Sequence, residues 1–208
     1  MARILAVTPT FDGRMCPESF KSIWDLDKCG HDVLFGFVRG YTVADARHAM
    51  VERARAAGAD YLLMVDSDVV VPQDALANLL ECDAHVCLGY YAHRGSMGRL
   101  TNLCAVGGHF HSLYSAADMH AKRDAGDPLL IVKGGGLGCA LVKMEVFDLI
   151  SYPFFRWYVY PDGHGTLSED LYFVLKCEKA GIPIVADARV ECGHVLSGTV
   201  YPGEWGFR

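Results

Sequence analysis

The chain has 208 residues, 51% of them hydrophobic and 21% charged, with a formal net charge of −6. This composition excludes a disordered segment, and the length predicts one domain, at about 150 residues per domain. The negative charge disfavours nonspecific binding to nucleic acid or to an anionic membrane, because both need a positive surface.

The N-terminal half alternates apolar runs with amphipathic stretches. Strands are predicted over 3–8, 32–38, 61–65 and 84–89, and helices over 17–28, 43–57 and from Pro72 onwards. Thr42 and Asp45 resemble a capping box at the start of the second helix, and Gly58 ends it. Strand–helix units of about 25–30 residues predict a βαβ series and a mainly parallel sheet.

The C-terminal half is less regular. Residues 91–130 show little periodicity, which predicts excursion loops or a short β-ribbon. Strands are expected over 129–133, 138–142, 183–186 and 189–192, before a glycine-rich tail. A helix over 168–180 is capped by Ser168 and stopped by Gly181. Neither a repeat nor a linker divides the chain, so we expect a single domain over 1–208.

No apolar run approaches the roughly 18 residues of a membrane-spanning helix, and the short apolar start is unlike a signal peptide. The eight cysteines form no C-x-x-C pair, which favours free thiols in a reducing compartment over a disulfide framework. We therefore expect a cytoplasmic protein.

The most informative segment is Asp66-Ser67-Asp68, which follows the apolar run 61–65. Ligands of open α/β sheets bind beyond the carboxyl ends of the strands, so these carboxylates are expected in the crevice. Carboxylate oxygens are the ligands that Mg²⁺ and Mn²⁺ prefer. An Asp after a strand is also a common turn or cap residue, and its position at a buried strand end favours the metal interpretation.

Two further segments carry ionisable groups. Ser168-Glu169-Asp170 is compatible with a plain helix start, because a Ser cap and acids in the first turn need no function. The alternative is that one carboxylate acts as a general base towards an attacking hydroxyl. Gly193-His194 follows a short strand, where a neutral imidazole is able to complete a metal site.

Taken together, these motifs resemble a known family. Asp66-Ser67-Asp68, the turn Gly135-Gly136-x-Gly138, Ser168-Glu169-Asp170 and Gly193-His194 stand in the order seen in GT-A fold glycosyltransferases. The similarity is to the family-2-like enzymes that use nucleotide-activated sugars, and it spans about 3–90 and 134–195. It implies a GT-A-like α/β domain with a mainly parallel central sheet flanked by helices and a small antiparallel β addition in the C-terminal half.

The resemblance also implies roles for individual residues. Asp68, assisted by Asp66, and His194 would hold a Mn²⁺ or Mg²⁺ ion at the donor diphosphate, and Asp170 would be the base of an inverting displacement. Glu169 would position donor or acceptor. The remaining donor contacts implied are Thr8, Pro9, Thr10, Arg47, Asp66, Ser67, Gly135 and Gly136. Many relatives carry Asn after that arginine, where this chain has His48.

The activity implied is metal-dependent transfer of a sugar from a nucleotide sugar, a UDP- or GDP-sugar, to a hydroxyl acceptor. Residues 1–90 would form the nucleotide-binding half, and 91–208 the acceptor and catalytic half with a flexible tail. The acceptor stays open among a glycan, a lipid carrier, a protein and a modified nucleobase.

Several alternatives stay open. A nucleotidyltransferase would also use a metal and a nucleotide-binding fold. Such an enzyme would carry a Gly-rich, basic signature after the first strand, and residues 8–14 fit that signature poorly. A binding module without turnover is the alternative from another class. The histidines around 93–120 and the cysteines Cys82, Cys87 and Cys104 lack the regular spacing of a zinc site. The aromatic residues at 152–160 either pack in the core, or some of them stack on an acceptor. The tail, 195–208, is expected to order over bound donor.

Overall fold

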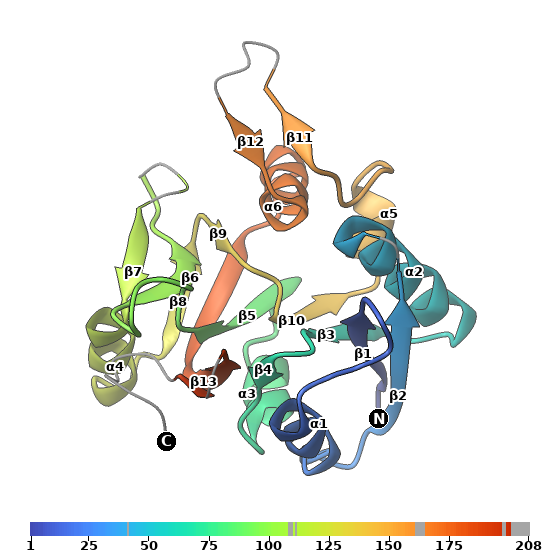
Figure 1. The fold of residues 1–208 in the computed structure, drawn as a ribbon, viewed down its shortest axis with the longest axis horizontal. Coiled ribbons are helices and arrows are strands. Elements are labelled where there is room, and N and C mark those ends of the chain that lie inside the picture. Colours follow the sequence, from blue (N-terminus) through green and yellow to red (C-terminus); the bar gives the residue numbers. More distant parts are fainter. Residues whose placement is uncertain (41, 108–109, 111, 161–164, 197–198, 201–208) are drawn as a thin grey trace.

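A twisted sheet runs through the molecule with helices on both sides (Figure 1). It is seen in a computed structural model that describes residues 1–40, 42–107, 110, 112–160, 165–196 and 199–200. Within these residues the sheet has nine strands. They are β1 (Arg3–Thr10), β2 (Asp32–Arg39), β3 (Tyr61–Val65), β4 (Val69–Val70), β5 (Val86–Tyr91), β8 (Leu129–Val132), β10 (Cys139–Lys143), β13 (Ile184–Val195) and β14 (Thr199–Val200).

The central sheet is mainly parallel, as predicted. Its order is β14-β13-β5-β10-β3-β1-β2, with β4 and β8 paired to β13. β1 is parallel to β2 and β3, and β13 is parallel to β5. β10 lies antiparallel between β3 and β5. Five of the central strands therefore point one way, and their carboxyl ends share one edge with the start of β10.

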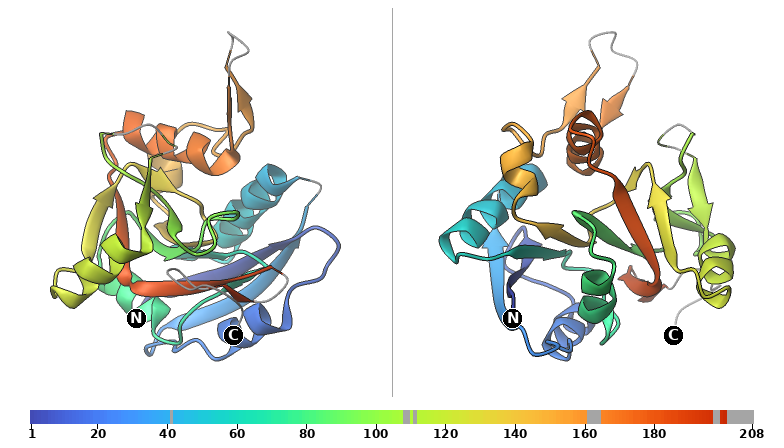
Figure 2. Two further views of the ribbon diagram at one scale, coloured as in Figure 1. Left: turned by 60° about the vertical axis from the view of Figure 1, so that its left-hand side comes forward. Right: turned by 180° about the vertical axis from the view of Figure 1, so that it is seen from behind.

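The inner strands β1, β3, β5 and β10 are buried on both faces, and this explains their continuous apolar sequences, whereas the edge strand β2 is largely exposed. Leu5 and Val7 of β1 pack in one core cluster, whereas Ile4 and Ala6 pack in a second cluster on the other face. The first cluster lies under the helices α2 (Val43–Ala56), α5 (Val146–Leu149) and α6 (Glu169–Lys179). The second lies under α1 (Pro17–Trp24) and α3 (Ala75–Glu81). Figure 2 shows these two helical layers from other sides.

The predicted helix signals are present at two helices next to the site. The hydroxyl of Thr42 accepts a hydrogen bond from the backbone N–H of Asp45 at 3.1 Å, and α2 ends before Gly58, whose φ is +60°. Ser168 caps α6 by accepting from the N–H of Leu171 at 3.4 Å, and Gly181 follows with a φ of +70°. These caps fix the N-termini of α2 and α6.

The two strands expected over 183–186 and 189–192 are one strand, β13, and that prediction is wrong. Its register against β5 shifts between Ala186 and Glu191. The buried Asp187 within this irregularity accepts hydrogen bonds from the backbone N–H and the guanidinium of Arg189, at 2.9 and 2.7 Å. A local bulge with a neutralised carboxylate lets the polar pair stay inside a continuous strand.

The expectation of loops or a ribbon over 91–130 is partly confirmed. β6 (Leu100–Cys104), β7 (Leu113–Ser115) and β9 (Gly134–Gly135) form a small sheet, but α4 (Ala116–Asp124) was not expected. α4 buries little apolar surface, and a capping box between Ser115 and Asp118 starts it. Only Ala116 and Met119 of α4 are buried, so the sequence lacks a broad apolar stripe and the capping box is the clearer signal for this helix.

A hairpin of β11 (Tyr158–Val159) and β12 (Thr166–Leu167) projects beyond α6 (Figures 1 and 2). Because β10 and β13 from the C-terminal half join the strands of the N-terminal half, both halves share one sheet. The functional division at about residue 90 stays a prediction.

The eight cysteines are free thiols, five of them buried. In the described part of the chain, none of the helices has the length and apolar character to cross a membrane.

His48, which stands where many of the similar enzymes carry Asn, holds the segment around Phe154 and Phe155 in place by hydrogen bonds. Its Nε2 accepts hydrogen bonds from the backbone N–H groups of Phe154 and Phe155, at 3.1 and 3.3 Å. Burial lowers the pKa of His48, against the raising effect of Asp45 and Glu52. The neutral imidazole is therefore the form that the fold requires, because a protonated Nε2 has no lone pair to accept with.

The free energy of unfolding should consequently fall as the pH drops through and below about 6.5, the ordinary histidine pKa. The sign follows because the unfolded chain takes up the proton before the folded one does. Urea unfolding of wild type and His48→Gln between pH 5 and 8 measures the difference, with His85→Gln, an exposed histidine, as control. Equal pH slopes in wild type and His48→Gln would contradict this role.

Candidate active site

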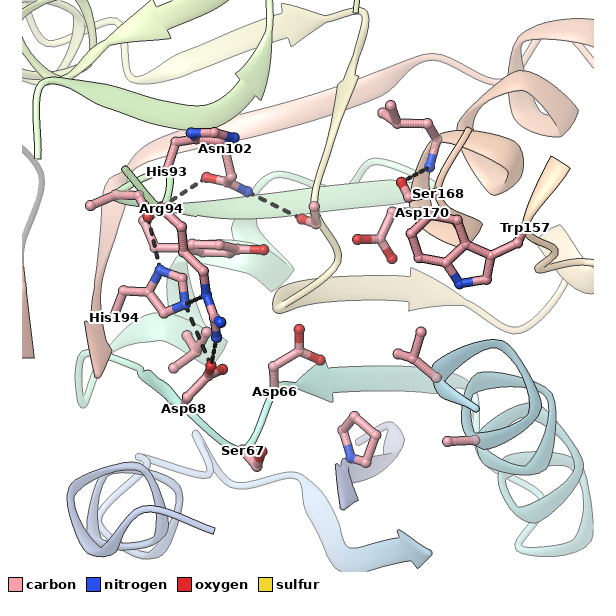
Figure 3. Close-up of a pocket in the computed structure, with 18 of the residues that line it drawn as sticks. Asp66, Ser67, Asp68, His93, Arg94, Asn102, Trp157, Ser168, Asp170 and His194 are labelled. Atoms are coloured by element: carbon pink, nitrogen blue, oxygen red, sulfur yellow. Dashed lines mark hydrogen bonds and ion pairs between the residues drawn. The ribbon is translucent and has the colours of Figure 1, made fainter. Parts of the chain in front are cut away.

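A cavity of about 930 Å³ opens at the carboxyl edge of the parallel strands (Figure 3). β1, β3 and β5 end at this edge and β10 begins there, which is where open α/β sheets bind ligands. The volume lies at the upper end of small-molecule sites, about 300–1,000 Å³. The polar and ionisable lining residues are Thr10, Thr42, Asp66, Ser67, Asp68, Tyr91, His93, Arg94, Asn102, Trp157, Thr166, Ser168, Asp170 and His194.

Asp68 and His194 form a pair on one side of this cavity. Asp68 follows β3, His194 lies near the end of β13, and Asp68 Oδ2 is 3.5 Å from His194 Nε2. The backbone brings them together, because β4 pairs with β13 and the N–H of Val195 donates to the carbonyl of Asp68 at 2.8 Å. Two of the three predicted metal ligands therefore converge.

The chemistry of this pair fits a divalent cation. His194 Nδ1 lies 2.9 Å from the carbonyl oxygen of Ala92, which only accepts, so Nδ1 carries the proton and the Nε2 lone pair faces Asp68. A carboxylate oxygen and an imidazole lone pair are both donors that a divalent cation accepts.

The third predicted ligand, Asp66, faces a different partner. Its carboxylate lies 3.3 Å from the guanidinium of Arg47, an α2 residue whose side chain is only 1% exposed. In the described ranges, no three His, Cys, Asp or Glu side chains group closely enough to hold a metal. Coordination by Asp66 therefore stays a prediction.

Arg47 joins three carboxylates beneath the cavity. Its Nε lies 3.1 Å from Asp170 and 3.5 Å from Glu169, in addition to its contact with Asp66. These acids raise the pKa of Arg47 against the opposing effect of burial. Because the guanidinium faces the acids, it is not accessible to nucleotide phosphates in this conformation. A contact of Arg47 with the nucleotide stays a prediction.

Asp170 is the acid of this cluster that lines the cavity, in the first turn of α6 (Figure 3). Burial, with the negative charges of Glu169 and Asp66, raises its pKa to about 7, although Arg47 opposes the shift. Its Oδ1 is buried and faces the Arg47 guanidinium, 3.1 Å from Nε. Asp170 is therefore a largely buried carboxyl group that lines the cavity and has a pKa suited to proton transfer near neutral pH.

The predicted nucleoside contacts differ in their access to the cavity. Pro9 and Thr10 line it, whereas Thr8 is 2% exposed and belongs to the sheet. The Thr10 hydroxyl donates to the carbonyl of Val38 at 3.4 Å, and Ser67 lines the cavity between the two acids. Of the two predicted glycines, Gly136 lines the cavity and Gly135 is buried in β9.

Tyr91 and Asn102 organise the glycine turn, and sequence reasoning missed both. Asn102 donates to the carbonyl of Gly136 at 3.2 Å and accepts from the N–H of Tyr91 at 2.9 Å. The Tyr91 hydroxyl accepts from the N–H of Gly138 at 3.2 Å. An Asn inside a strand is the available signal, because Asn is depleted there and its amide needs a reason to be buried.

Gly136 has no room for a side chain, because a Cβ there would clash with the Tyr91 hydroxyl. Gly136→Ala should destabilise the protein by about 1–3 kcal/mol. Tyr91→Phe removes the clashing atom but leaves the Gly138 N–H without its acceptor, a cost of about 1–3 kcal/mol. The double variant should therefore lose less than the sum of the two, as read from urea unfolding. Strict additivity would show that the two residues do not meet as described.

The other candidate groups have different outcomes. Trp157, 56% exposed, lines the cavity near Asp170 (Figure 3). His109 and His111, and most of the tail expected to close over the donor, lie outside the described residues. For the cysteines and the remaining histidines of the zinc alternative, the described part of the chain contains no three-ligand cluster.

Comparisons with known proteins test the fold. No family model and no curated protein matches the sequence. Among solved structures, A197 from STIV matches with a TM-score of 0.62 and 18% identity, covering 99% of this chain and 97% of that one. S. aureus TarS 1-349 in complex with UDP matches more weakly, with a TM-score of 0.49 and 14% identity, covering 96% of this chain and 59% of that one. The likeness to A197 confirms the predicted fold class, a mixed α/β domain with a mostly parallel central sheet, consistent with the GT-A-like fold.

Proposed function

We propose that this protein is a glycosyltransferase that moves a sugar from a UDP- or GDP-sugar to a hydroxyl group of an acceptor, with inversion at the anomeric carbon. One observation carries the proposal. The carboxylate–imidazole pair of Asp68 and His194, and a separate carboxyl group with a raised pKa, Asp170, line the same cavity. Transfer from a nucleotide sugar needs both, one for the leaving diphosphate and one for the attacking hydroxyl.

Asp170 acts as the general base in this proposal. Its carboxylate, which lines the cavity, accepts the proton of the acceptor hydroxyl as the acceptor oxygen forms its bond to the anomeric carbon. The bond from that carbon to the donor diphosphate breaks, and the nucleoside diphosphate leaves with the electron pair. Arg47 limits the charge of the three acids around it, which keeps Asp170 ionisable near neutral pH despite its burial.

Asp68 and His194 would hold the Mn²⁺ or Mg²⁺ ion, with Asp66 as the predicted third ligand. Bound there, the ion would neutralise charge on the leaving diphosphate. The Ala92 carbonyl supports this role by holding the His194 tautomer that leaves Nε2 available.

The nucleoside would lie against Pro9 and Thr10, near the start of α2, where Gly40 and Thr42 also line the cavity. The sugar would then extend towards Gly136 and Asp170. Trp157 is the aromatic surface for an acceptor on the far side of Asp170. The acceptor classes considered are a glycan, a lipid carrier, a protein and a modified nucleobase.

Calorimetry tests the donor half of the proposal without an acceptor. UDP and GDP are titrated into the protein with and without Mn²⁺, and AMP and CMP serve as controls for nonspecific binding. We expect one of the two diphosphates to bind more tightly in the presence of Mn²⁺. Equal, weak affinity for all four nucleotides under both conditions would contradict a nucleotide-sugar site.

A further inference from the structure

Arg94 occupies the pair that the proposed function assigns to a divalent ion. Its Nη2 is in direct contact with Asp68 Oδ2, and its Nε donates to His194 Nε2 at 3.3 Å (Figure 3). The guanidinium thus uses both the carboxylate oxygen and the imidazole lone pair that a metal ion would use. A guanidinium and a divalent ion cannot share these two atoms, because each atom faces one cation at a time.

The backbone that carries Arg94 is held independently of this contact. In the loop between β5 and β6, the N–H of His93 donates to the carbonyl of Leu100 at 2.8 Å, and the N–H of Ser96 donates to that of His93 at 3.1 Å. The Ser96 hydroxyl also donates to the carbonyl of His93, at 2.7 Å. Loss of the side-chain contact therefore leaves the loop in place, and only the side chain needs to turn.

The side chain is also free enough to leave. Arg94 is 64% exposed, whereas Asp68 is 25% and His194 7% exposed. An exposed guanidinium gives up its partners at low cost, because solvent screens the pair and hydrates the released group. His194, in contrast, stays fixed by Ala92 and by edge contact with Tyr91, whose ring centroid lies 5.2 Å away.

We propose that Arg94 is the competing cation of the Asp68–His194 pair, and that it turns to the donor diphosphate when a divalent ion takes its place. The inference rests on the proposed function, since it needs both the ion and the donor. It makes Arg94 a positioning residue that couples the two ligands. The free protein binds the ion weakly because Arg94 must be displaced, and the diphosphate strengthens ion binding by offering the guanidinium a new anionic partner.

The first test is Mn²⁺ calorimetry on the full chain without nucleotide. Arg94→Met removes the donors and keeps the length of the side chain, and should bind Mn²⁺ about tenfold more tightly than wild type, the order of a typical coupling between two ligands. Arg55→Met is the matched control, because Arg55 is 39% exposed and pairs with Asp148 at 2.9 Å outside the cavity lining. Asp68→Asn identifies the binding as that of this site.

The second test separates displacement from a general effect of charge. In wild-type protein, the Nε–H NMR signal of Arg94, assigned by its loss in Arg94→Met, should shift when diamagnetic Mg²⁺ is added. With UDP or GDP present, the gain in Mn²⁺ affinity caused by the nucleotide should be several-fold smaller in Arg94→Met than in wild type, since the exchange of partners is gone.

The outcomes separate this inference from the proposed function. Equal Mn²⁺ affinity of wild type and Arg94→Met, abolished in Asp68→Asn, would overturn the role of Arg94 and keep the metal site. An unmoved Arg94 signal at saturating Mg²⁺ would also overturn it. Failure of all variants to bind Mn²⁺, with or without nucleotide, would overturn the metal assignment of the proposed function itself.

Discussion

Replacing Asp170 by asparagine is expected to lower the turnover of sugar transfer by about 10²–10⁴-fold, the usual contribution of a general base. Donor affinity should change little, because the proposed mechanism places Asp170 against the acceptor and the amide keeps the shape of the side chain. The fold should also persist, since Arg47 retains Asp66 and Glu169 as partners. Steady-state kinetics and calorimetry on the same preparation give both quantities.

The matched control is Asp118→Asn, which removes a carboxylate from the first turn of another helix. Asp118 belongs to the capping box of α4, so loss of its charge should cost about 0.3–1 kcal/mol of stability with normal turnover per folded molecule. Asp170→Asn should show the reverse. Near-wild-type transfer by Asp170→Asn would rule out the inverting-base assignment and favour a retaining mechanism or another base.

The pKa of about 7 adds a pH signature to this variant. Transfer by wild type should rise as the pH increases through about 7, because only the ionised carboxylate accepts a proton. Stability should move the other way. A carboxyl group with a raised folded pKa favours folding when protonated, so its contribution declines as the pH rises from about 4 to about 7. At pH 8, Asp170→Asn should therefore be at least as stable as wild type.

Asp68→Asn should have the second large effect, a loss of about 100-fold or more in Mn²⁺-dependent nucleotide affinity. Substituting a residue that hydrogen-bonds to a metal ligand lowers metal affinity or activity by about 10–100-fold, so losing the ligand itself should cost at least as much. The fold should survive, because the backbone carbonyl of Asp68 still accepts from Val195. Calorimetry with and without Mn²⁺ measures the loss.

Asp25→Asn is the control for this variant, since Asp25 is an exposed carboxylate that pairs with Lys21 on α1. It should keep the wild-type Mn²⁺ dependence. Unchanged Mn²⁺-dependent affinity in Asp68→Asn, with intact circular dichroism, would mean that the ion, where it binds, uses other ligands.

The sheet is predictable from sequence because its inner strands are buried on both faces. Runs such as 3–8 and 61–65 leave no face for water, and the turn signals between them are unambiguous. The same physics predicts where the chemistry lies. Asp66 and Asp68 follow a buried strand, and the carboxyl ends of parallel strands share one edge of the sheet. Their convergence with His194 depends on long-range pairing of β13, which local patterns do not specify.

What the sequence does not reveal is how the charges are partnered. In a sequence, an arginine such as Arg47 is expected at the surface or at a phosphate. In the structure, three acids from distant parts of the chain surround it in the core. The contacts of Arg94 and Tyr91 are unpredictable for the same reason, because their partners Asp68 and Gly138 lie far away along the chain. Hydrogen-bond and ion-pair partners of buried groups are properties of the packed chain, so local propensity does not predict them.

The most direct test of the central claim is a turnover screen. A panel of UDP- and GDP-sugars is incubated with Mn²⁺ and wild-type protein, and the released nucleotide is identified by chromatography, with Asp170→Asn and Asp68→Asn in parallel. The account predicts release of one nucleoside diphosphate from a restricted set of sugars, lost in both variants. Absence of release from every donor, or turnover of a nucleoside triphosphate and a sugar phosphate to pyrophosphate, would contradict it.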